Sequence, residues 1–412
     1  MLKRISVRQL TVGMHIKEFC GSWMEHPFIR ASFVLSNAKD LNVILASSIK
    51  EVWIDSSKGL DVPASVPVVS EKQAKIEIDA ALEQVALGGR RAVRLPIEHE
   101  MERAALICSQ SKQAMVSMFE EVRMGNSVDV GGARDLVEEI SDSVMRNPSA
   151  LISLARLKTV DDYTYLHSVA VCAMMVVLAK QLGLDEAKTR LAGLAGLMHD
   201  LGKAAMPPAV LNKPGKLTAA EFEIIKSHPV KGHAMLMMSD NFDADTLDVC
   251  LHHHEKMDGS GYPEGLKGDA ISLMAKMGAV CDVYDAITSN RPYKTGWDPA
   301  ESLRKMAEWS NGHFDKKVFQ AFVKSMGIYP VGSLVQLSSG RIGVVTEQVA
   351  ASLVMPRVKV FFSTKSNMRI ASELVDLSSP GTTERIVGRE DPEKWGFPDL
   401  DQLWSGIDIV RR

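Results

Sequence analysis

Histidines and carboxylates gather in the middle of the chain in a pattern that could bind metal ions. Eight of the eleven histidines fall between residues 167 and 313. His199 and Asp200 are adjacent, two further histidines begin the glycine-punctuated stretch 253–263 (HHEKMDGSGYP), and Asp282 follows in an apolar run. Imidazole and carboxylate ligands together suit Fe, Mn or Zn, and a carboxylate can bridge two cations. Two cations roughly 3.5 to 4 Å apart can hold a hydroxide and neutralise a phosphoryl group. The sequence therefore predicts a split metal site.

Helix boundaries place these side chains where they can converge. His167 opens one helical run, the pair at 199–200 closes another, and His228 precedes a proline at a helix break. Side chains at helix ends meet more readily than side chains in helix middles. Lys203, one turn beyond the pair, could donate to a phosphate oxygen or a leaving group. The alternative for this lysine is a cation that completes a helix C-terminus.

The chain of 412 residues is long enough for two or three domains. The pattern predicts a mainly α protein, in which a helical bundle carries the metal site between two small modules. The expected parts are an N-terminal regulatory α/β module (1–70), a helical linker (71–144), the helical catalytic domain (145–328), and a small β module with an irregular tail (329–412). The amphipathic stretch 97–124 within the linker favours a partner helix, so a homodimer is compatible with the sequence.

Charge and cysteine usage narrow the class of protein. The balance of 48 basic and 51 acidic side chains disfavours a nucleic acid polymer as the partner. The five cysteines have no CxxC spacing, which is typical of buried thiols in a reducing cytosol. The N-terminus lacks the pattern of a secretion signal, and the most apolar window, 169–178, is short for a membrane span. We expect a soluble cytoplasmic protein.

Four motifs together resemble the HD-GYP family. They are residues 199–203 (HDLGK), 253–263 (HHEKMDGSGYP), 282–286 (DVYDA) and 291–294 (RPYK). The resemblance covers about residues 145–328 and implies a bacterial, metal-dependent phosphodiesterase with a helical HD-domain bundle that acts on cyclic di-GMP. Residues 10–14 and 23–28 resemble, more weakly, a module that precedes HD-GYP domains in some bacterial proteins, which implies a regulatory role.

The family's functional residues map onto this sequence one by one. The resemblance implies seven metal ligands: His167, His199, Asp200, His228, His253, His254 and Asp282. Asp200 would bridge the metals and Lys203 would assist at the scissile phosphate, so these two form the catalytic pair. Substrate contacts would come from Arg291 and Lys294, which hold phosphates, and from Gly261 and Tyr262, which shape the pocket. The implied cofactors are two divalent ions per chain, Fe or Mn first, with Zn, Ni or Mg as alternatives.

Departures from the family pattern bear on the number of metals. Members with three metals carry a glutamate four residues before the first ligand histidine, and Tyr163 stands there in this chain. Asp161 and Asp162 are out of register, so two metals are expected. Lys276 replaces a usual arginine without touching the ligand set. His252 could replace a neighbour after a one-residue slip, although the distance to Gly261 favours the pair at 253–254.

Other residues in the same region have simpler interpretations. His233 and His313 fall outside the ligand pattern and are expected in the core or on the surface. Met235, Met237 and Met238 are expected to fill the core.

The favoured function is hydrolysis of cyclic di-GMP to pGpG, GMP or both, by metal-hydroxide attack on phosphorus. One alternative is a cyclic di-GMP sensor or protein-docking module with little turnover, and other cyclic di-GMP signalling proteins are compatible partners. Another is a general HD-type nucleotidase or a hydrolase of a different cyclic dinucleotide, which the glycine-tyrosine-proline loop disfavours. The sequence leaves open the native metal, the final product, the signal sensed, the oligomeric state and the role of the C-terminal module.

Overall fold

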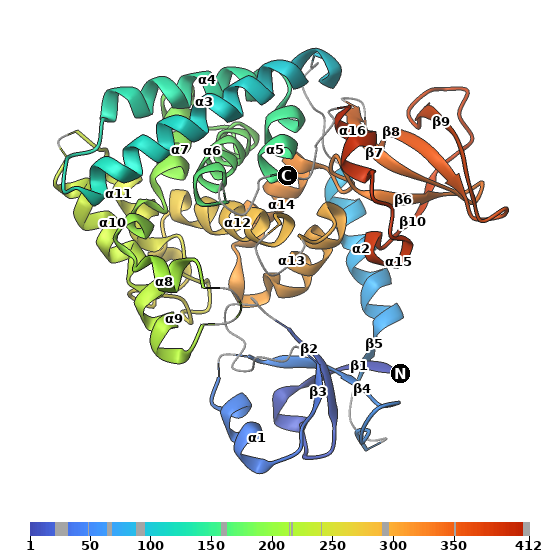
Figure 1. The fold of residues 1–412 in the computed structure, drawn as a ribbon. Coiled ribbons are helices and arrows are strands. Elements are labelled where there is room, and N and C mark those ends of the chain that lie inside the picture. The colour runs from blue at the N-terminus through green and yellow to red at the C-terminus, as the bar shows by residue number, and fades with distance from the viewer. Residues whose placement is uncertain are drawn as a thin grey trace. The chain divides into compact units, whose positions relative to one another are not determined.

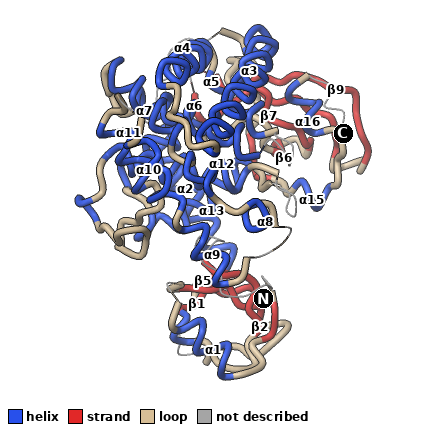
Figure 2. The backbone as a smooth tube through the Cα atoms, turned by 60° about the vertical axis from the view of Figure 1, so that its left-hand side comes forward, coloured by secondary structure: helices blue, strands red, loops and turns tan. Residues whose placement is uncertain are grey.

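The computed structural model describes most of the chain: residues 1–20, 32–47, 49–63, 68–87, 95–157, 163–213, 215, 217–239, 241–290, 296–349 and 352–406. The chain forms two compact units, residues 1–82 with 304–311 and residues 83–303 with 312–412. Helices dominate the larger unit (Figure 1; Figure 2). The mainly α fold with a small sheet module near each end is therefore confirmed.

The smaller unit is built on a five-stranded antiparallel sheet in the order β3-β2-β4-β1-β5. Its strands are β1 (Leu2–Ser6), β2 (His15–Cys20), β3 (Phe33–Val34), β4 (Glu51–Asp55) and β5 (Val69–Ser70). Helix α1 (Ala38–Leu45) begins after Asn37, whose side chain accepts a hydrogen bond from the backbone N–H of Asp40. Ile16, Ile44 and Val52 are fully buried and form part of one core between sheet and helix.

The larger unit contains a helical bundle and a second sheet. Its helices are α3 (Ile97–Arg123), α4 (Val130–Arg146), α5 (Pro148–Arg156), α6 (Tyr163–Gln181), α7 (Glu186–Met198), α8 (Pro208–Leu211), α9 (Ala219–Lys226), α10 (His228–Met237), α11 (Ala244–His252), α12 (Leu273–Thr288) and α14 (Lys316–Met326). Helices α2 (Glu71–Leu87) and α13 (Pro299–His313) contain residues of both units. A short 3-10 helix, η3 (Leu201–Ala205), follows α7.

Helix α6 is the centre of the bundle. Fourteen consecutive residues, 166–179, are buried, because α4, α5, α7, α12 and α14 pack around the helix. A helix that is apolar all round is a core helix or a membrane span. Among the described residues α6 alone has the length and composition to cross a membrane, and 72% of its apolar window is buried inside the protein, as in a core helix.

Helices α3 and α4 pack within the same unit as the metal-site helices. Helix α3 lies against α5 and α6, and α4 lies against α6 and α7. The two helices are joined by a partly buried ion pair, since the buried carboxylate of Glu100 accepts hydrogen bonds from Arg146 (2.8 Å) and Ser143 (2.9 Å). The proposed linker 71–144 thus contains two helices of the bundle, and the four-part division of the chain stays a prediction.

The C-terminal module is an antiparallel sheet in the order β10-β6-β7-β8-β9. Its elements are β6 (Leu334–Leu337), β7 (Arg341–Val349), β8 (Ser352–Ser363), β9 (Met368–Asp376), β10 (Ile386–Arg389), α15 (Pro392–Trp395) and α16 (Leu400–Ser405). Arg156 of α5 donates to the carbonyl of Val331 (3.1 Å), and Asp298 accepts from the N–H of Leu334 (3.0 Å), so the sheet is tied to the bundle.

Candidate metal centre

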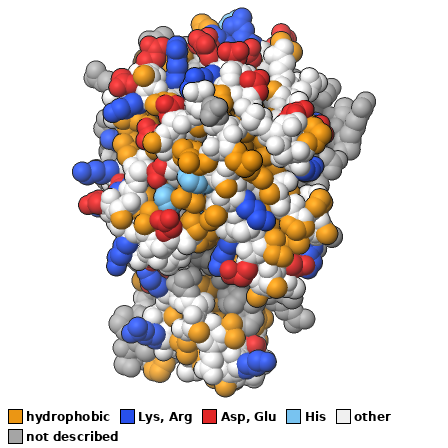
Figure 3. Space-filling view, turned by 90° about the vertical axis from the view of Figure 1, so that its left-hand side faces the viewer, with side chains coloured by type: hydrophobic (Ala, Val, Ile, Leu, Met, Phe, Trp, Pro, Cys, Tyr) orange, Lys and Arg blue, Asp and Glu red, His pale blue; other side chains and the backbone are white. Residues whose placement is uncertain are grey.

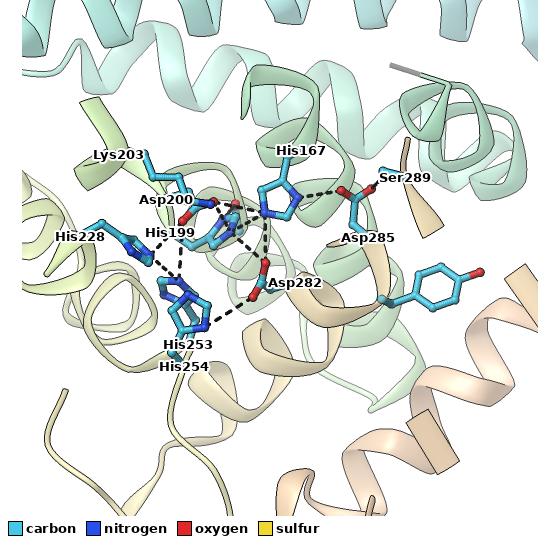
Figure 4. Close-up of polar contacts among 12 residues, drawn as sticks. His167, His199, Asp200, Lys203, His228, His253, His254, Asp282, Asp285 and Ser289 are labelled. Carbon is cyan, nitrogen blue, oxygen red and sulfur yellow. Dashed lines mark hydrogen bonds and ion pairs between the residues drawn. The ribbon is translucent and has the colours of Figure 1, made fainter. Parts of the chain in front are cut away.

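The expected ligands come from five separate parts of the bundle and converge on one buried point (Figure 4). His167 lies in the first turns of α6, His199 and Asp200 follow the end of α7, and His228 is the first residue of α10. The remaining ligands follow α11 (His253 and His254) or lie in the middle of α12 (Asp282). The prediction that helix ends supply the site thus describes most of the group, while Asp282 comes from within a helix.

Asp200 lies between two groups of imidazoles and presents one oxygen to each. Oδ2 is 3.2 Å from Nε2 of His167 and 3.4 Å from Nε2 of His199. Oδ1 is 3.1 Å from Nε2 of His228 and 3.8 Å from Nε2 of His253. A carboxylate whose two oxygens face different pairs of histidines could bridge two cations.

Two further ligands complete the two groups. Oδ1 of Asp282 lies 3.1 Å from Nε2 of His167 and completes the first set of three potential ligands together with His199. His254 joins His228 and His253 in the second set. The potential ligand atoms within each set lie within 4.8 Å of one another, which suits convergence on a single ion.

Hydrogen bonds on the far side of the rings fix which nitrogen is free to bind metal. Nδ1 of His199 donates to the carbonyl of Gly196 (2.7 Å), and Nδ1 of His228 donates to the carbonyl of Ile225 (2.7 Å). Nδ1 of His253 likewise faces a backbone carbonyl at 3.0 Å. Because a carbonyl only accepts, Nδ1 carries the hydrogen in the neutral ring and Nε2 turns a lone pair toward Asp200.

Lone pairs that face carboxylate oxygens repel one another unless a cation lies between them. Oδ1 of Asp200 and Oδ2 of Asp282 are buried and accept no hydrogen bond. Burial raises the pKa of the Asp200 carboxyl, but Lys203 and the neighbouring histidines outweigh burial and hold this pKa well below the usual range. Two buried anions with unpartnered oxygens amid acceptor nitrogens fit metal ions.

The pKa values of two histidines agree with a site that attracts cations. Burial lowers the pKa of His167, but hydrogen bonds with three aspartates outweigh burial and raise it to about 10. A proton on this ring would therefore compete with a metal ion. Burial lowers the pKa of His254 to about 3, so this ring is neutral and keeps its lone pair available.

Lys203 and the 253–263 loop frame the centre. Nζ of Lys203 donates to Oδ2 of Asp200, and the lysine side chain is 18% exposed, so its ammonium group lies between the buried centre and solvent. Tyr262 stacks on His254 with ring centroids 4.7 Å apart. Gly261 leaves room for a close backbone approach, because a Cβ there would come within 2.6 Å of the His254 carbonyl oxygen.

Two carboxylates support the site although the sequence analysis gave them no role. Asp285, one turn after Asp282, accepts a hydrogen bond from Nδ1 of His167 at 2.7 Å and so orients that ring. Its spacing on α12 was the available signal, because residues three apart share a helix face. Glu255 accepts from the N–H groups of Glu264 (2.8 Å) and Gly265 (3.0 Å) and closes the loop.

Several sequence predictions concern residues around the centre. Tyr163, which stands at the position of the glutamate in the three-metal pattern, stacks on His167 with ring centroids 5.7 Å apart. His252 pairs with Asp248 (2.7 Å) and belongs to no ligand set among the described residues. Lys276 lies 3.6 Å from Asp269. Arg291, Lys294, Asp161, Asp162 and the stretch 23–28 lie outside the described residues.

One expectation about core packing was wrong. Met237 and Met238 are 61% and 76% exposed, and Met235 is only half-buried, so these residues do not fill the core. These methionines are exposed because α10 ends at the surface of the protein.

Figure 3 shows a face of the molecule on which histidine side chains lie among hydrophobic ones. His233 is half-buried and His313 stacks on Phe314 at 4.2 Å, in agreement with their expected non-ligand positions.

Comparison with known proteins gives a consistent family assignment. A family model described as an HD domain matches residues 140–318, and one described as a domain of unknown function matches residues 2–133. A cyclic di-GMP phosphodiesterase of Pseudomonas aeruginosa is 55% identical over 408 residues, which are 99% of this chain and 96% of that protein. A cyclic di-GMP phosphodiesterase response regulator of Xanthomonas campestris is 43% identical over 149 residues, which are 36% of this chain and 39% of that protein. A 3'3'-cGAMP-specific phosphodiesterase of Vibrio cholerae is 37% identical over 168 residues, which are 40% of this chain and 39% of that protein.

Proposed function

Because the chain belongs to the HD-GYP family of HD-domain phosphodiesterases, we propose that it hydrolyses cyclic di-GMP at a centre of two divalent cations. Cyclic di-GMP as the substrate is supported by the relative from Pseudomonas aeruginosa, which is named for that activity and aligns with nearly the whole chain. The observation that supports two cations is the orientation of the Asp200 carboxylate: Oδ2 faces His167 of one ligand set and Oδ1 faces His228 of the other.

The residues of each set would hold one ion. His167, His199 and Asp282 would hold the first, and His228, His253 and His254 would hold the second, with Asp200 shared between them. When bound, a pair of divalent cations neutralises charge on a phosphodiester and activates water as a nucleophile. Iron or manganese are the ions that we propose, because mixed imidazole and carboxylate ligands suit them.

The remaining side chains would bind and orient the substrate. Lys203, at the border between the buried centre and solvent, would donate a proton or hydrogen bond to the ester oxygen that departs. Tyr262 would form one wall of the pocket, since its ring is held against His254. Arg291 and Lys294, which lie outside the described residues, remain our proposed ligands for the phosphates.

Substrate and product can be tested together. Anaerobically purified protein should consume cyclic di-GMP faster than 3'3'-cGAMP, and chromatography should detect pGpG, GMP or both. Treatment with a chelator should abolish turnover, and Fe²⁺ or Mn²⁺ should restore it. Faster consumption of 3'3'-cGAMP would reassign the substrate. Turnover that survives complete removal of metal would contradict the proposed chemistry.

A sensor without turnover is the second candidate. The convergence of all seven ligands argues against it, because a receptor needs no buried cation to activate water. Metal-loaded protein that binds cyclic di-GMP and leaves it intact would establish the sensor and exclude the hydrolase.

A further inference from the structure

Glu255 is a buried carboxylate that directly follows His254, a residue of the second ligand set. The residue is only 2% exposed. Its Oε1 accepts hydrogen bonds from the backbone N–H groups of Glu264 (2.8 Å) and Gly265 (3.0 Å). Its Oε2 is buried as well, and the described residues donate no hydrogen bond to it. Because burying a carboxylate is costly, the two bonds to Oε1 must offset that cost within the described part of the chain.

These two bonds fix the chain just after Tyr262. Glu264 and Gly265 lie two and three residues beyond Tyr262. The N–H of Tyr262 itself donates to the carbonyl of His254 over 3.3 Å, which is long for such a bond. Hydrogen bonds to a charged oxygen are shorter and about twice as strong as bonds between neutral groups. The Glu255 carboxylate is therefore the stronger of the two anchors on this part of the chain.

The place of the Tyr262 ring depends on these anchors. The ring stacks on His254 with centroids 4.7 Å apart and planes inclined by 26°. Stacking of two rings contributes modestly, so it does not hold the ring firmly by itself. The backbone around Gly261 lies close against the ligand pair, because a Cβ there would come within 2.5 Å of the Glu255 Cα. A shift of residues 264–265 would therefore move the Tyr262 ring relative to the metal ligands.

We propose that Glu255 is a positioning residue for substrate binding. This inference rests on the proposed function, in which Tyr262 forms one wall of the pocket for cyclic di-GMP. Glu255 fixes residues 264–265, these residues hold the Tyr262 ring beside His254, and the ring contacts the substrate. A contact of this kind is the same before and during the reaction. Its loss weakens binding and leaves the chemical step at the metal ions nearly unchanged.

Two substitutions at one position test the hydrogen bonds. Glu255→Ala removes the acceptor and should raise KM for cyclic di-GMP about tenfold, while kcat changes by less than about threefold. Glu255→Gln keeps an oxygen that can accept the same bonds, so its KM should stay within about threefold of that of the unaltered chain. Glu264→Ala is the matched control and should leave KM unchanged, because that side chain is 55% exposed and the backbone N–H remains. An unchanged KM in Glu255→Ala would overturn the proposal.

A double substitution tests whether Glu255 acts through Tyr262. Tyr262→Ala should itself raise KM for cyclic di-GMP. Glu255→Ala introduced into that variant should then raise KM by less than about threefold further, because the ring that Glu255 positions is already absent. A full tenfold increase on top of Tyr262→Ala would show that Glu255 acts by another route.

A small substrate distinguishes positioning from support of the metal ligands. Bis-para-nitrophenyl phosphate is a phosphodiester without guanine bases, so its hydrolysis needs the metal ions and little of the pocket wall. Glu255→Ala should hydrolyse it at nearly the rate of the unaltered chain and should retain the same metal content. Loss of metal, or equal loss of activity on both substrates, would assign Glu255 to the metal centre and overturn the proposal.

Binding measurements keep this test separate from that of the proposed function. If the unaltered metal-loaded chain binds cyclic di-GMP and leaves it intact, the proposed hydrolysis fails, whereas the role of Glu255 can still be measured. Glu255→Ala should then raise the dissociation constant for cyclic di-GMP about tenfold, and Glu255→Gln should not. Equal dissociation constants for Glu255→Ala and the unaltered chain would overturn the positioning role.

Discussion

At the scale of single residues, the candidate metal centre is distinguished by ring nitrogens that carry no hydrogen and face carboxylate oxygens. Backbone carbonyls hold the Nδ1 hydrogens of His199, His228 and His253 on the outer side of the rings. Their Nε2 lone pairs therefore face the oxygens of Asp200, and a cation between them would relieve the repulsion. The cost of removing Asp200 should accordingly fall on both ions.

Asp200→Asn keeps the shape of the side chain but removes its charge and one of its two acceptor oxygens. We expect turnover of cyclic di-GMP to be lost and the content of both metals to fall together, by about tenfold or more in affinity. Element analysis after dialysis measures the metals. Asp248→Asn is the control, because Asp248 pairs with His252 outside the ligand sets. Retention of both metals at a near-normal rate would show that Asp200 is not the bridge.

Asp285→Asn should act mainly on one ion. Asp285 orients the ring of His167, which belongs to the first ligand set, so its loss should weaken the ion held by His167 by about tenfold and leave the other nearly unchanged. A chelator titration that follows stepwise metal release measures the difference. Asp269→Asn, at a fully exposed position, is the control. Equal loss of both ions would indicate a general structural defect.

The candidate ligands could be named from the sequence through the family resemblance, whereas their supporting contacts could not. Asp285 follows Asp282 by one helical turn, but nothing in the sequence shows that His167 from a distant helix lies beside it. Gly196 and Ile225 contribute through carbonyl groups, which every residue possesses. Contacts of this kind depend on tertiary structure and leave no mark on residue type.

At the scale of elements, helical periodicity predicted that a face is buried but not which neighbour covers it. The amphipathic stretch 97–124 became α3, whose apolar face packs inside its own unit, with Phe119 in edge contact with Tyr165 at 5.4 Å. A dimerising role for this face therefore has no support in the structure. The buried carboxylate of Glu100 is a second feature that an amphipathic pattern hides.

Glu100→Gln should destabilise the helical unit by about 1 to 3 kcal/mol, because the substitution removes the anionic partner of the Arg146 guanidinium, whose partial exposure to solvent moderates the loss. Burial raises the pKa of Glu100, but hydrogen bonds from Arg146 and Ser143 outweigh burial and lower it below the usual value. The stabilisation is therefore present above the unfolded-state pKa and is lost as pH falls through the lower folded-state pKa.

Urea unfolding at neutral and acidic pH measures this effect. The difference between Glu100→Gln and the unaltered chain should shrink on acidification. Glu102→Gln, at an exposed position on the same helix, should change the free energy of unfolding by less than about 0.5 kcal/mol. A constant difference across the pH range would mean that the ionised carboxylate is not the stabilising group.

At the scale of the whole molecule, a mainly α fold with a small sheet module near each end could be predicted, but the details of the C-terminal module could not. The small β module expected within 329–412 forms a five-stranded sheet, β6 to β10, followed by two short helices that the sequence analysis did not predict. Strand β9 is exposed on both faces, so its sequence lacks the alternation that marks a half-buried strand. The tail of this module was expected to be irregular, yet the end of the described chain contains β10, α15 and α16.

Because α3 packs against the bundle, we expect an active fragment of the chain to need this helix. Residues 83–412 contain every helix that surrounds α6, whereas residues 140–330 lack α3 and break α4. We expect the longer fragment to bind metal and hydrolyse cyclic di-GMP, and the shorter one to melt several degrees lower with less bound metal, because Tyr165 near the ligand His167 loses Phe119. Circular dichroism and element analysis compare them. Equal melting temperatures would show that α3 contributes little.

If one buried centre around Asp200 holds two metal ions and hydrolyses a phosphodiester, as we propose, activity should require two ions per chain. The most direct test counts metal ions per chain in anaerobically purified, active protein by element analysis and anomalous scattering, while metal is added back stepwise to chelated protein. We predict two ions per chain, with turnover of cyclic di-GMP appearing only as the second site fills. Three fully occupied sites, or full activity with a single ion, would contradict a two-metal centre bridged by Asp200.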